Sequence, residues 1–249
     1  MPVRGEEALR WAKHQGFGFV HLDLDDVAGG GRGGVRALRT TATNCGVRLA
    51  GFALSSLQTA GIRDRRAARQ IIDRGLDVAR RLGVNFIYLP SFGAAEIRSE
   101  DDLRRTAELL RHALERSDPG MIVASESSLS AEATIRLFDA IGDPRACLLF
   151  DTQNPVFAGR DPVALARAVG HLVGPYVHVK DGRSRTADAV IGCGLSDVAA
   201  TIDALTDGGF SGSFVLENEY RLRASAQAQA DQLALKCLIE QFVERSGSP

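Results

Sequence analysis

Short apolar runs alternate with amphipathic stretches from one end of the chain to the other. A short apolar run predicts a buried strand, whereas apolar residues that recur with the helical period predict a helix with one buried face. The predicted strands are residues 18–24, 48–54, 86–90, 121–125, 146–150, 176–179 and 213–216, with a short further strand near 189–191. The predicted helices are residues 6–15, 35–45, 63–82, 100–116, 131–141, 162–169, 197–207 and 224–243.

Regular alternation of strand and helix predicts a parallel sheet whose strands are joined by helical crossovers. Eight such units fit a closed barrel better than an open sheet, and barrels of this type contain about 250 residues. The chain has 249 residues, and no linker or low-complexity tract divides it. We therefore predict an α/β fold, a (β/α)8 TIM barrel that forms a single domain over residues 1–249.

The charge balance limits the kinds of partner. The chain has 30 Lys and Arg against 31 Asp and Glu, a net charge of −1, so it has no general attraction for nucleic acid or an anionic membrane. It contains no apolar run of about 18 residues and no apolar signal segment at its start. Its four cysteines are too scattered for a zinc knuckle or a redox pair. These features predict a cytoplasmic protein with a small-molecule substrate, and they leave homo-oligomer formation open.

Four of the predicted strands end in a residue that can bind a divalent metal ion: Glu126, Asp151, His178 and Glu217. An ionisable residue at the end of an apolar strand is unusual, and the carboxyl ends of barrel strands meet at one face. Three carboxylates and one imidazole predict a site for one divalent metal ion. Mn²⁺ fits this set best, and Mg²⁺, Co²⁺ and Zn²⁺ are the alternatives.

A metal site of this kind suits a substrate that carries adjacent hydroxyl and carbonyl groups. The ion would stabilise the negative charge of a bound enediolate, while Glu126 and Glu217 remove and return a proton from opposite sides. This chemistry predicts an isomerase or epimerase of a sugar or related polyhydroxy carbonyl compound. A lyase or dehydratase that eliminates β to the carbonyl is the alternative, because it begins with the same deprotonation.

Several short spans carry a family resemblance. Glu126, Asp151-Thr-Gln-Asn154, His178-Val-Lys-Asp181, Gly192-Cys-Gly194 and the span 209–217 resemble motifs of the xylose-isomerase-like sugar isomerase and epimerase superfamily. The resemblance implies a TIM barrel, one divalent ion on the four strand-end residues, and the two glutamates as the acid and base. It also implies that Lys180 and Asp181 position the substrate or support the metal ligands. Arg183 or Arg185 could then bind a substrate hydroxyl, carboxylate or phosphate.

Two positions depart from the family pattern. Asn154 stands where many relatives carry histidine, and it can hydrogen-bond a substrate hydroxyl but cannot serve as an acid or base. Cys193 stands where relatives often carry glutamate. Both positions lie where substrate identity would be decided.

Two further acids are candidates for substrate contacts. Asp23 ends the first predicted strand, where it could bind substrate or cap the following loop. Glu219 shares parity with Glu217 and could be a ligand, a substrate contact or a surface acid, and Asn218 between them would then face the surrounding helices.

Other functions fit less well. An endonuclease-like phosphodiesterase would need many histidines, but there are five and only His178 ends a predicted strand. A dinucleotide site at Gly29–Gly34 would need an acid after the second strand, which the sequence lacks, so we interpret this span as a loop that could act as a lid. Arginines between 63 and 81 alternate with acids, which indicates a solvated helix face rather than a phosphate site. A non-catalytic relative would be expected to lack a ligand, and all four are present.

Overall fold

The structure is a computed structural model that describes residues 5–28, 31–220 and 224–246. In these residues the strands are β1 Phe19–Asp23, β2 Arg48–Ala53, β3 Phe86–Pro90, β4 Ile122–Glu126, β5 Ala146–Asp151, β6 Val173–Val179 and β7 Ser213–Leu216. The sheet follows chain order from β1 to β7, and the pairs run parallel. Parallel strands in chain order with helices between them form a TIM barrel, so the predicted fold class is confirmed.

Each of the eight predicted helices is present, and α6, α7 and α9 have the predicted bounds. Three short helices, α2, α4 and α8, begin shortly after strands and were not predicted, because four or five residues are too few to show a helical period. The helices are α1 Gly5–His14, α2 Leu24–Ala28, α3 Gly31–Cys45, α4 Leu57–Ala60, α5 Arg65–Leu82, α6 Glu100–Arg116, α7 Ala131–Ile141, α8 Asn154–Phe157, α9 Pro162–Val169, α10 Val198–Asp207 and α11 Ala224–Ser246, with the 3-10 turns η1 Gly93–Ala95 and η2 Gly170–Leu172.

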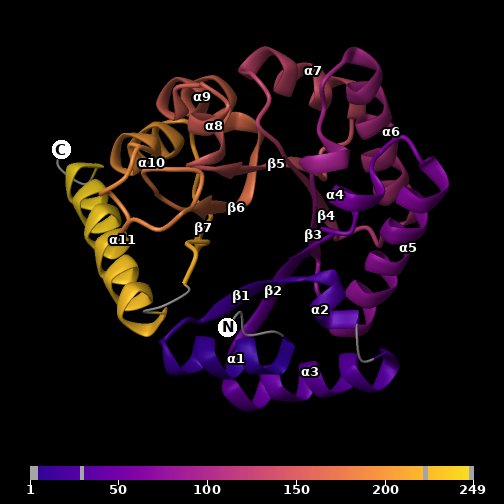
Figure 1. The fold of residues 1–249 in the computed structure, drawn as a ribbon, viewed down its shortest axis with the longest axis horizontal. Coiled ribbons are helices and arrows are strands. Elements are labelled where there is room, and N and C mark those ends of the chain that lie inside the picture. The colour runs from indigo at the N-terminus through magenta and orange to yellow at the C-terminus, as the bar shows by residue number, and fades with distance from the viewer. Residues whose placement is uncertain (1–4, 29–30, 221–223, 247–249) are drawn as a thin grey trace. The chain divides into compact units, whose positions relative to one another are not determined.

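Two compact units share the chain. The first lies within Val3–Ser127 and Glu132–Leu149, and the second within Ser128–Ala131 and Phe150–Pro249. In the first unit, α5 and α6 pack together outside β3 and β4 (Figure 1). In the second unit, α9 packs on α10 beside the paired strands β6 and β7 (Figure 1). The assignment of a single domain stays a prediction.

The predicted short strand near 189–191 is wrong. This segment lies beside the chain that follows β6 and the chain that follows β7, because the amide of Ala189 donates to the Asp181 carbonyl and the amide of Glu219 donates to the Ala187 carbonyl. Several of the backbone amides that follow donate to side chains instead of to a neighbouring strand. The amide of Ile191, for example, donates to Asp231 of α11 at 3.0 Å. A loop held by carboxylates therefore takes the place of an eighth strand.

Part of the predicted lid is also wrong. Gly31–Gly34 belong to the first turn of α3 and are not loop. Gly29 and Gly30 lie outside the described residues, so a lid role at those two positions stays a prediction. Within the described ranges, every helix is too short or too polar to cross a membrane.

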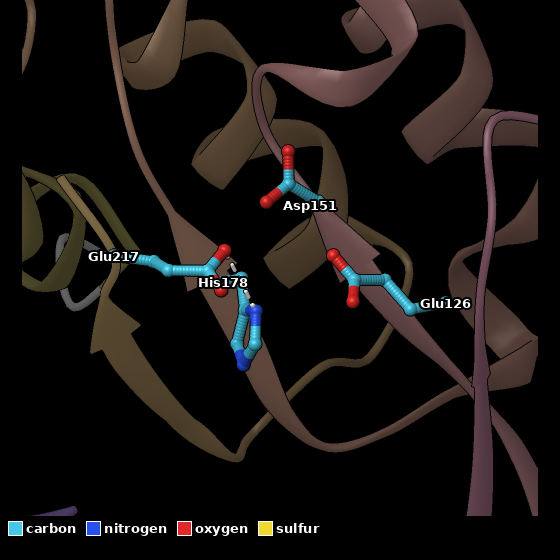
Figure 2. A group of neighbouring side chains, drawn as sticks. All are labelled: Glu126, Asp151, His178 and Glu217. Atoms are coloured by element: carbon cyan, nitrogen blue, oxygen red, sulfur yellow. Dashed lines mark hydrogen bonds and ion pairs between the residues drawn. The ribbon is translucent and has the colours of Figure 1, made fainter. Parts of the chain in front are cut away.

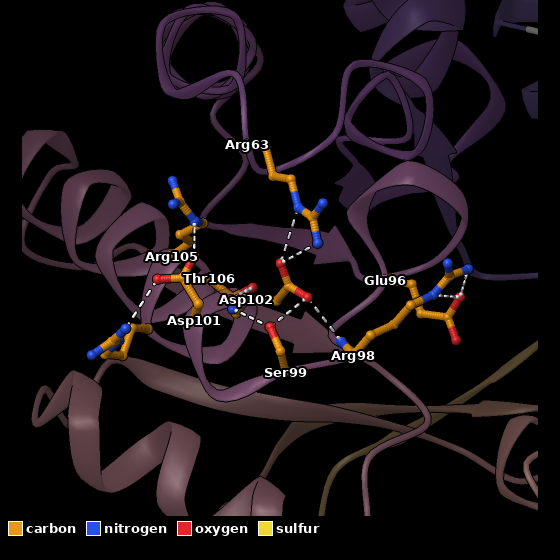
Figure 3. Close-up of polar contacts among 9 residues, drawn as sticks. Arg63, Glu96, Arg98, Ser99, Asp101, Asp102, Arg105 and Thr106 are labelled. Atoms are coloured by element: carbon orange, nitrogen blue, oxygen red, sulfur yellow. Dashed lines mark hydrogen bonds and ion pairs between the residues drawn. The ribbon is translucent and has the colours of Figure 1, made fainter.

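A buried carboxylate joins the starts of α5 and α6 (Figure 3). Asp102 is 1% exposed and accepts from the Ser99 hydroxyl at 2.9 Å, from the Arg98 amide at 3.3 Å and from the Arg63 guanidinium at 3.3 Å. The Ser99 hydroxyl in turn accepts from the Asp102 amide at 3.1 Å, a reciprocal helix cap. Burial acts to raise the pKa of Asp102, but these hydrogen bonds and the Arg63 charge together hold its pKa below the ordinary value.

Candidate metal and active site

Three of the four predicted ligands lie in the second unit. Asp151 is the last residue of β5, His178 lies one residue before the end of β6, and Glu217 directly follows β7. Asp151 and His178 are almost fully buried, whereas the Glu217 side chain is 40% exposed. Parallel strands end at the same edge of a sheet, so this local geometry follows directly from the strand register.

A compact polar cluster connects these side chains. His178 Nδ1 lies 3.1 Å from Glu217 Oε2, and Lys180 Nζ donates to the same oxygen at 2.8 Å. The Lys180 ammonium also lies 3.0 Å from Asp151 Oδ2. One ammonium therefore lies between two of the candidate ligand carboxylates, and the role of Lys180 in positioning substrate or supporting the metal ligands stays a prediction.

Asp151 is held by the chain that follows it. Its Oδ1 accepts from the amides of Gln153 at 2.8 Å and Asn154 at 2.6 Å, as the first turn of α8 forms. Its Oδ2 is buried and pairs with the Lys180 ammonium at 3.0 Å. Burial raises the pKa of Asp151, and the Lys180 charge offsets this only in part. A buried carboxylate of this kind is suited to a hard or borderline divalent metal ion.

The charge on Glu217 is better compensated. Desolvation acts to raise the pKa of this carboxyl, but the neighbouring His178 and Lys180 outweigh it and hold the pKa well below the ordinary range. Glu217 is therefore an ionised carboxylate, as a metal ligand must be.

Glu126, the fourth predicted ligand, is the last residue of β4 and is 4% exposed. Its carbonyl accepts from the Ser91 amide at 2.8 Å, which continues the β3 and β4 pairing to the strand end. Glu126, Asp151, His178 and Glu217 each offer one ligand atom, and these atoms lie within 4.8 Å of one another (Figure 2). This cluster could hold a metal ion, and its oxygen-rich donor set fits a hard or borderline divalent ion.

The Asp181 carboxylate binds the main chain of the loop that follows it, a role that the sequence did not indicate. Its carboxylate accepts four main-chain hydrogen bonds, from Gly182 and Ser196 on Oδ1 and from Gly192 and Gly194 on Oδ2, at 2.8–3.1 Å. Each oxygen thus accepts twice, and the residue is 1% exposed. This favours a role in holding loop 182–196 over the predicted substrate contact.

The same contacts explain the glycines of Gly192-Cys193-Gly194. Gly192 has a φ of +84°, a conformation that residues with a side chain rarely adopt. A Cβ on Gly194 would lie 2.1 Å from the Asp181 carboxylate. The Cys193 side chain between them is exposed, so this position is free to vary.

The other predicted substrate residues are less closely tied to the cluster. Asn154 is half-buried at the start of α8, and Glu219 is half-buried with its amide bonded to the Ala187 carbonyl at 2.7 Å. Arg183 is exposed, and its Nε donates to the Cys193 carbonyl at 3.1 Å. Asp23, in the first unit, accepts from the Asp25 amide at 2.8 Å, which supports the capping interpretation. Substrate contacts by these residues stay predictions.

Three residues to which the sequence analysis gave no role in the site, Thr152, Asn218 and Asp231, hold the chain around the cluster. Thr152 Oγ1 donates to the Lys180 carbonyl at 2.7 Å and accepts from the Lys180 amide at 3.1 Å, which ties the chain after β5 to the end of β6. Asn218 accepts from the Asp181 amide at 2.9 Å and donates to Asp231 of α11 at 2.8 Å. Asn218 does face a helix as its parity predicted, but nothing in the sequence marked Asp231 as its partner.

Comparisons with known proteins extend these observations. The sequence is 33% identical over 237 residues to 2-epi-5-epi-valiolone 7-phosphate 2-epimerase of Actinoplanes sp., with 91% of this chain and 87% of that protein covered. The fold is similar to that of D-psicose 3-epimerase from Clostridium cellulolyticum H10, with a TM-score of 0.75, 16% identity, and 94% of this chain and 92% of that one covered. It is also similar to a probable 3-DHS dehydratase of Bacillus anthracis, with a TM-score of 0.72, 14% identity, and coverage of 95% and 94%.

The likeness to the two solved structures shows the fold alone, whereas the epimerase shares a third of its aligned sequence with this chain. The family model described as xylose isomerase-like TIM barrel matches residues 9–238. Because that match takes in nearly the whole chain, including every strand and all four candidate ligands, the protein belongs to the xylose isomerase-like TIM barrel family.

Proposed function

We propose that the protein is a divalent-metal-dependent epimerase or isomerase of a sugar or related polyhydroxy carbonyl compound. The observation that carries the proposal is the cluster Glu126, Asp151, His178 and Glu217, whose ligand atoms lie within 4.8 Å of one another. The relative at 33% identity is a 2-epi-5-epi-valiolone 7-phosphate 2-epimerase, which supports an epimerase of this general kind. A bound divalent ion would offset the negative charge that develops on the substrate oxygens, with Mn²⁺ the ion we expect first.

The proposed chemistry needs a base and an acid. One glutamate takes the proton from the carbon beside the carbonyl, and the C–H electron pair forms the double bond of an enediolate as the carbonyl electrons move onto oxygen. The other glutamate returns a proton to the opposite side of that carbon, which inverts its configuration. We assign these roles to Glu217 and Glu126. Lys180, bonded to Glu217 at 2.8 Å, keeps that carboxylate oriented and ionised.

A lyase on the same scaffold is the second candidate. It shares the deprotonation, and the C–O bond at the β carbon then breaks, so that hydroxide leaves and takes a proton to form water. The Lys180 ammonium, within 3.0 Å of both Asp151 and Glu217, offers a proton donor for this step. The cytoplasmic location and a homo-oligomer stay predictions.

Solvent exchange tests the proposal. Protein loaded with Mn²⁺ is incubated in D2O with a panel of ketoses, inososes and their phosphate esters, and proton NMR follows the carbon beside the carbonyl. We expect deuterium wash-in together with a second epimer, lost in Glu217→Gln and kept in Glu115→Gln, which changes an exposed glutamate of α6. Exchange followed by an unsaturated product would favour the lyase instead. Absence of exchange in every substrate, with stoichiometric Mn²⁺ bound, would refute both.

A further inference from the structure

An open cavity outside the metal cluster has three arginines among its lining residues. It lies in the first unit and has a volume of about 390 Å³, with Val35, Arg36 and Arg39 of α3 and Arg81 of α5 among its walls. The two helices contact each other along the outside of this unit (Figure 1). Val35 is buried and contributes apolar surface to the lining, and the three arginines line the same cavity. This volume is within the range of small-molecule sites, about 300–1,000 Å³.

The charge in this cavity is only partly neutralised. Arg81 pairs with Asp77 at 2.7 Å, and its side chain is still 37% exposed. The side chains of Arg36 and Arg39 form no ion pair or hydrogen bond with any residue that the structure describes. Helix α3 contains no acidic residue that could pair with them. Two guanidiniums on successive turns of α3 therefore face the same space as a third, with one carboxylate between the three.

Other arginines of α5 form ion pairs with carboxylates outside their own helix. Arg65, Arg74 and Arg80 each lie within 4.0 Å of a carboxylate from another part of the chain. The solvated face predicted from sequence therefore describes much of α5, whereas Arg81 at its end meets the unpaired arginines of α3. Three positive charges that converge with one carboxylate are costly unless an anion joins them, and the planar guanidinium fork matches the oxygens of a phosphate.

We propose that the cavity between α3 and α5 binds a phosphate-bearing small molecule, whose phosphate is held by Arg36, Arg39 and Arg81 and whose body rests on Val35. The site shares no residue with the metal cluster. The proposal is independent of the proposed epimerase activity, and a diphosphate or a phosphate monoester supplies the chemistry that these side chains recognise.

Titration calorimetry with inorganic pyrophosphate tests the site, with the full-length protein and with ionic strength kept constant by KCl. We expect saturable binding of one pyrophosphate per chain, weakened at least tenfold in the double variant Arg36→Gln/Arg39→Gln. The matched control is Arg104→Gln/Arg136→Gln, which removes two exposed arginines that already pair with acids and should retain wild-type affinity. Lys180→Gln removes the cation of the metal cluster and should also leave the affinity unchanged.

Circular dichroism and the thermal midpoint in chloride show that each variant is folded, so a loss of binding can be assigned to the side chains. The proposal would be overturned by no saturable binding in wild type, by equal weakening in the control double variant, or by loss of binding in Lys180→Gln. The last result would place the pyrophosphate at the metal cluster. Retained binding in Arg36→Gln/Arg39→Gln would likewise exclude the α3 arginines as its ligands.

Discussion

Asp181→Asn should be one of the most damaging conservative substitutions in this protein. The carboxylate accepts four amide hydrogen bonds from Gly182, Gly192, Gly194 and Ser196 in a buried site. An asparagine side chain keeps one oxygen and replaces the other with an NH2 donor, so two of the four amides would face a donor. Hydrogen bonds to a charged group contribute about 1.5–3 kcal/mol each. The loss of two predicts a decrease of about 3–6 kcal/mol in the free energy of unfolding.

Urea unfolding measures the loss, and hydrogen exchange at the Gly192, Gly194 and Ser196 amides reports the loop itself. The matched control is Asp188→Asn, an exposed aspartate of the same loop whose substitution should change the free energy of unfolding by less than about 0.5 kcal/mol. The reasoning fails if Asp181→Asn unfolds within about 1 kcal/mol of wild type. It fails equally if the three amides keep their protection.

Three further predictions follow from single side chains. Lys180→Met removes the cation between Asp151 and Glu217, so metal-free protein should lose thermal stability. The two carboxylates should then bind Mn²⁺ more tightly. Calorimetry with Mn²⁺ measures this affinity, and an unchanged affinity would contradict the prediction. Asp102→Asn should cost about 1–3 kcal/mol at pH 7. Because the pKa of Asp102 is lowered by folding, that stability is present above the unfolded pKa of about 3.9 and disappears as pH falls through the folded pKa, so urea unfolding of wild type and variant should converge in acid. Burial raises the pKa of Cys147 to about 12, so in folded protein iodoacetamide at pH 8 should label the exposed Cys193 and Cys237 and leave Cys147 unmodified, as peptide mass spectrometry would show.

The strand ends of the site could be predicted from sequence because two simple regularities coincide there. A buried strand is apolar along its length, so Asp151 after Leu148-Leu-Phe150 and His178 after Tyr176-Val177 are conspicuous. Parallel strands in chain order then bring such ends to one edge. The ligands of the second unit were found in this way without any knowledge of their contacts.

The contacts around those ligands could not be predicted in the same way. Asn218 and Asp231 are 13 residues apart and meet only after β7 and α11 have packed, and the Ile191 amide reaches Asp231 across 40 positions. No local period signals such a pair. The arginine cavity has the same origin, since Arg36 and Arg81 belong to different helices and each looks like an ordinary surface residue when its own helix is considered alone.

The missing eighth strand shows how a side chain can replace a ladder of backbone hydrogen bonds. In a strand at this position, the amides of residues such as Gly192 and Gly194 would donate to neighbouring carbonyls; here they donate to the single carboxylate of Asp181. That arrangement frees the chain from an extended conformation, and the φ of +84° at Gly192 is one result. A loop fixed by one buried acid keeps the chain after β6 in place while its outward positions, such as Cys193, can change without cost to the fold. Substitution of Cys193 should therefore change the free energy of unfolding much less than substitution of Gly192 or Gly194, as urea unfolding would measure.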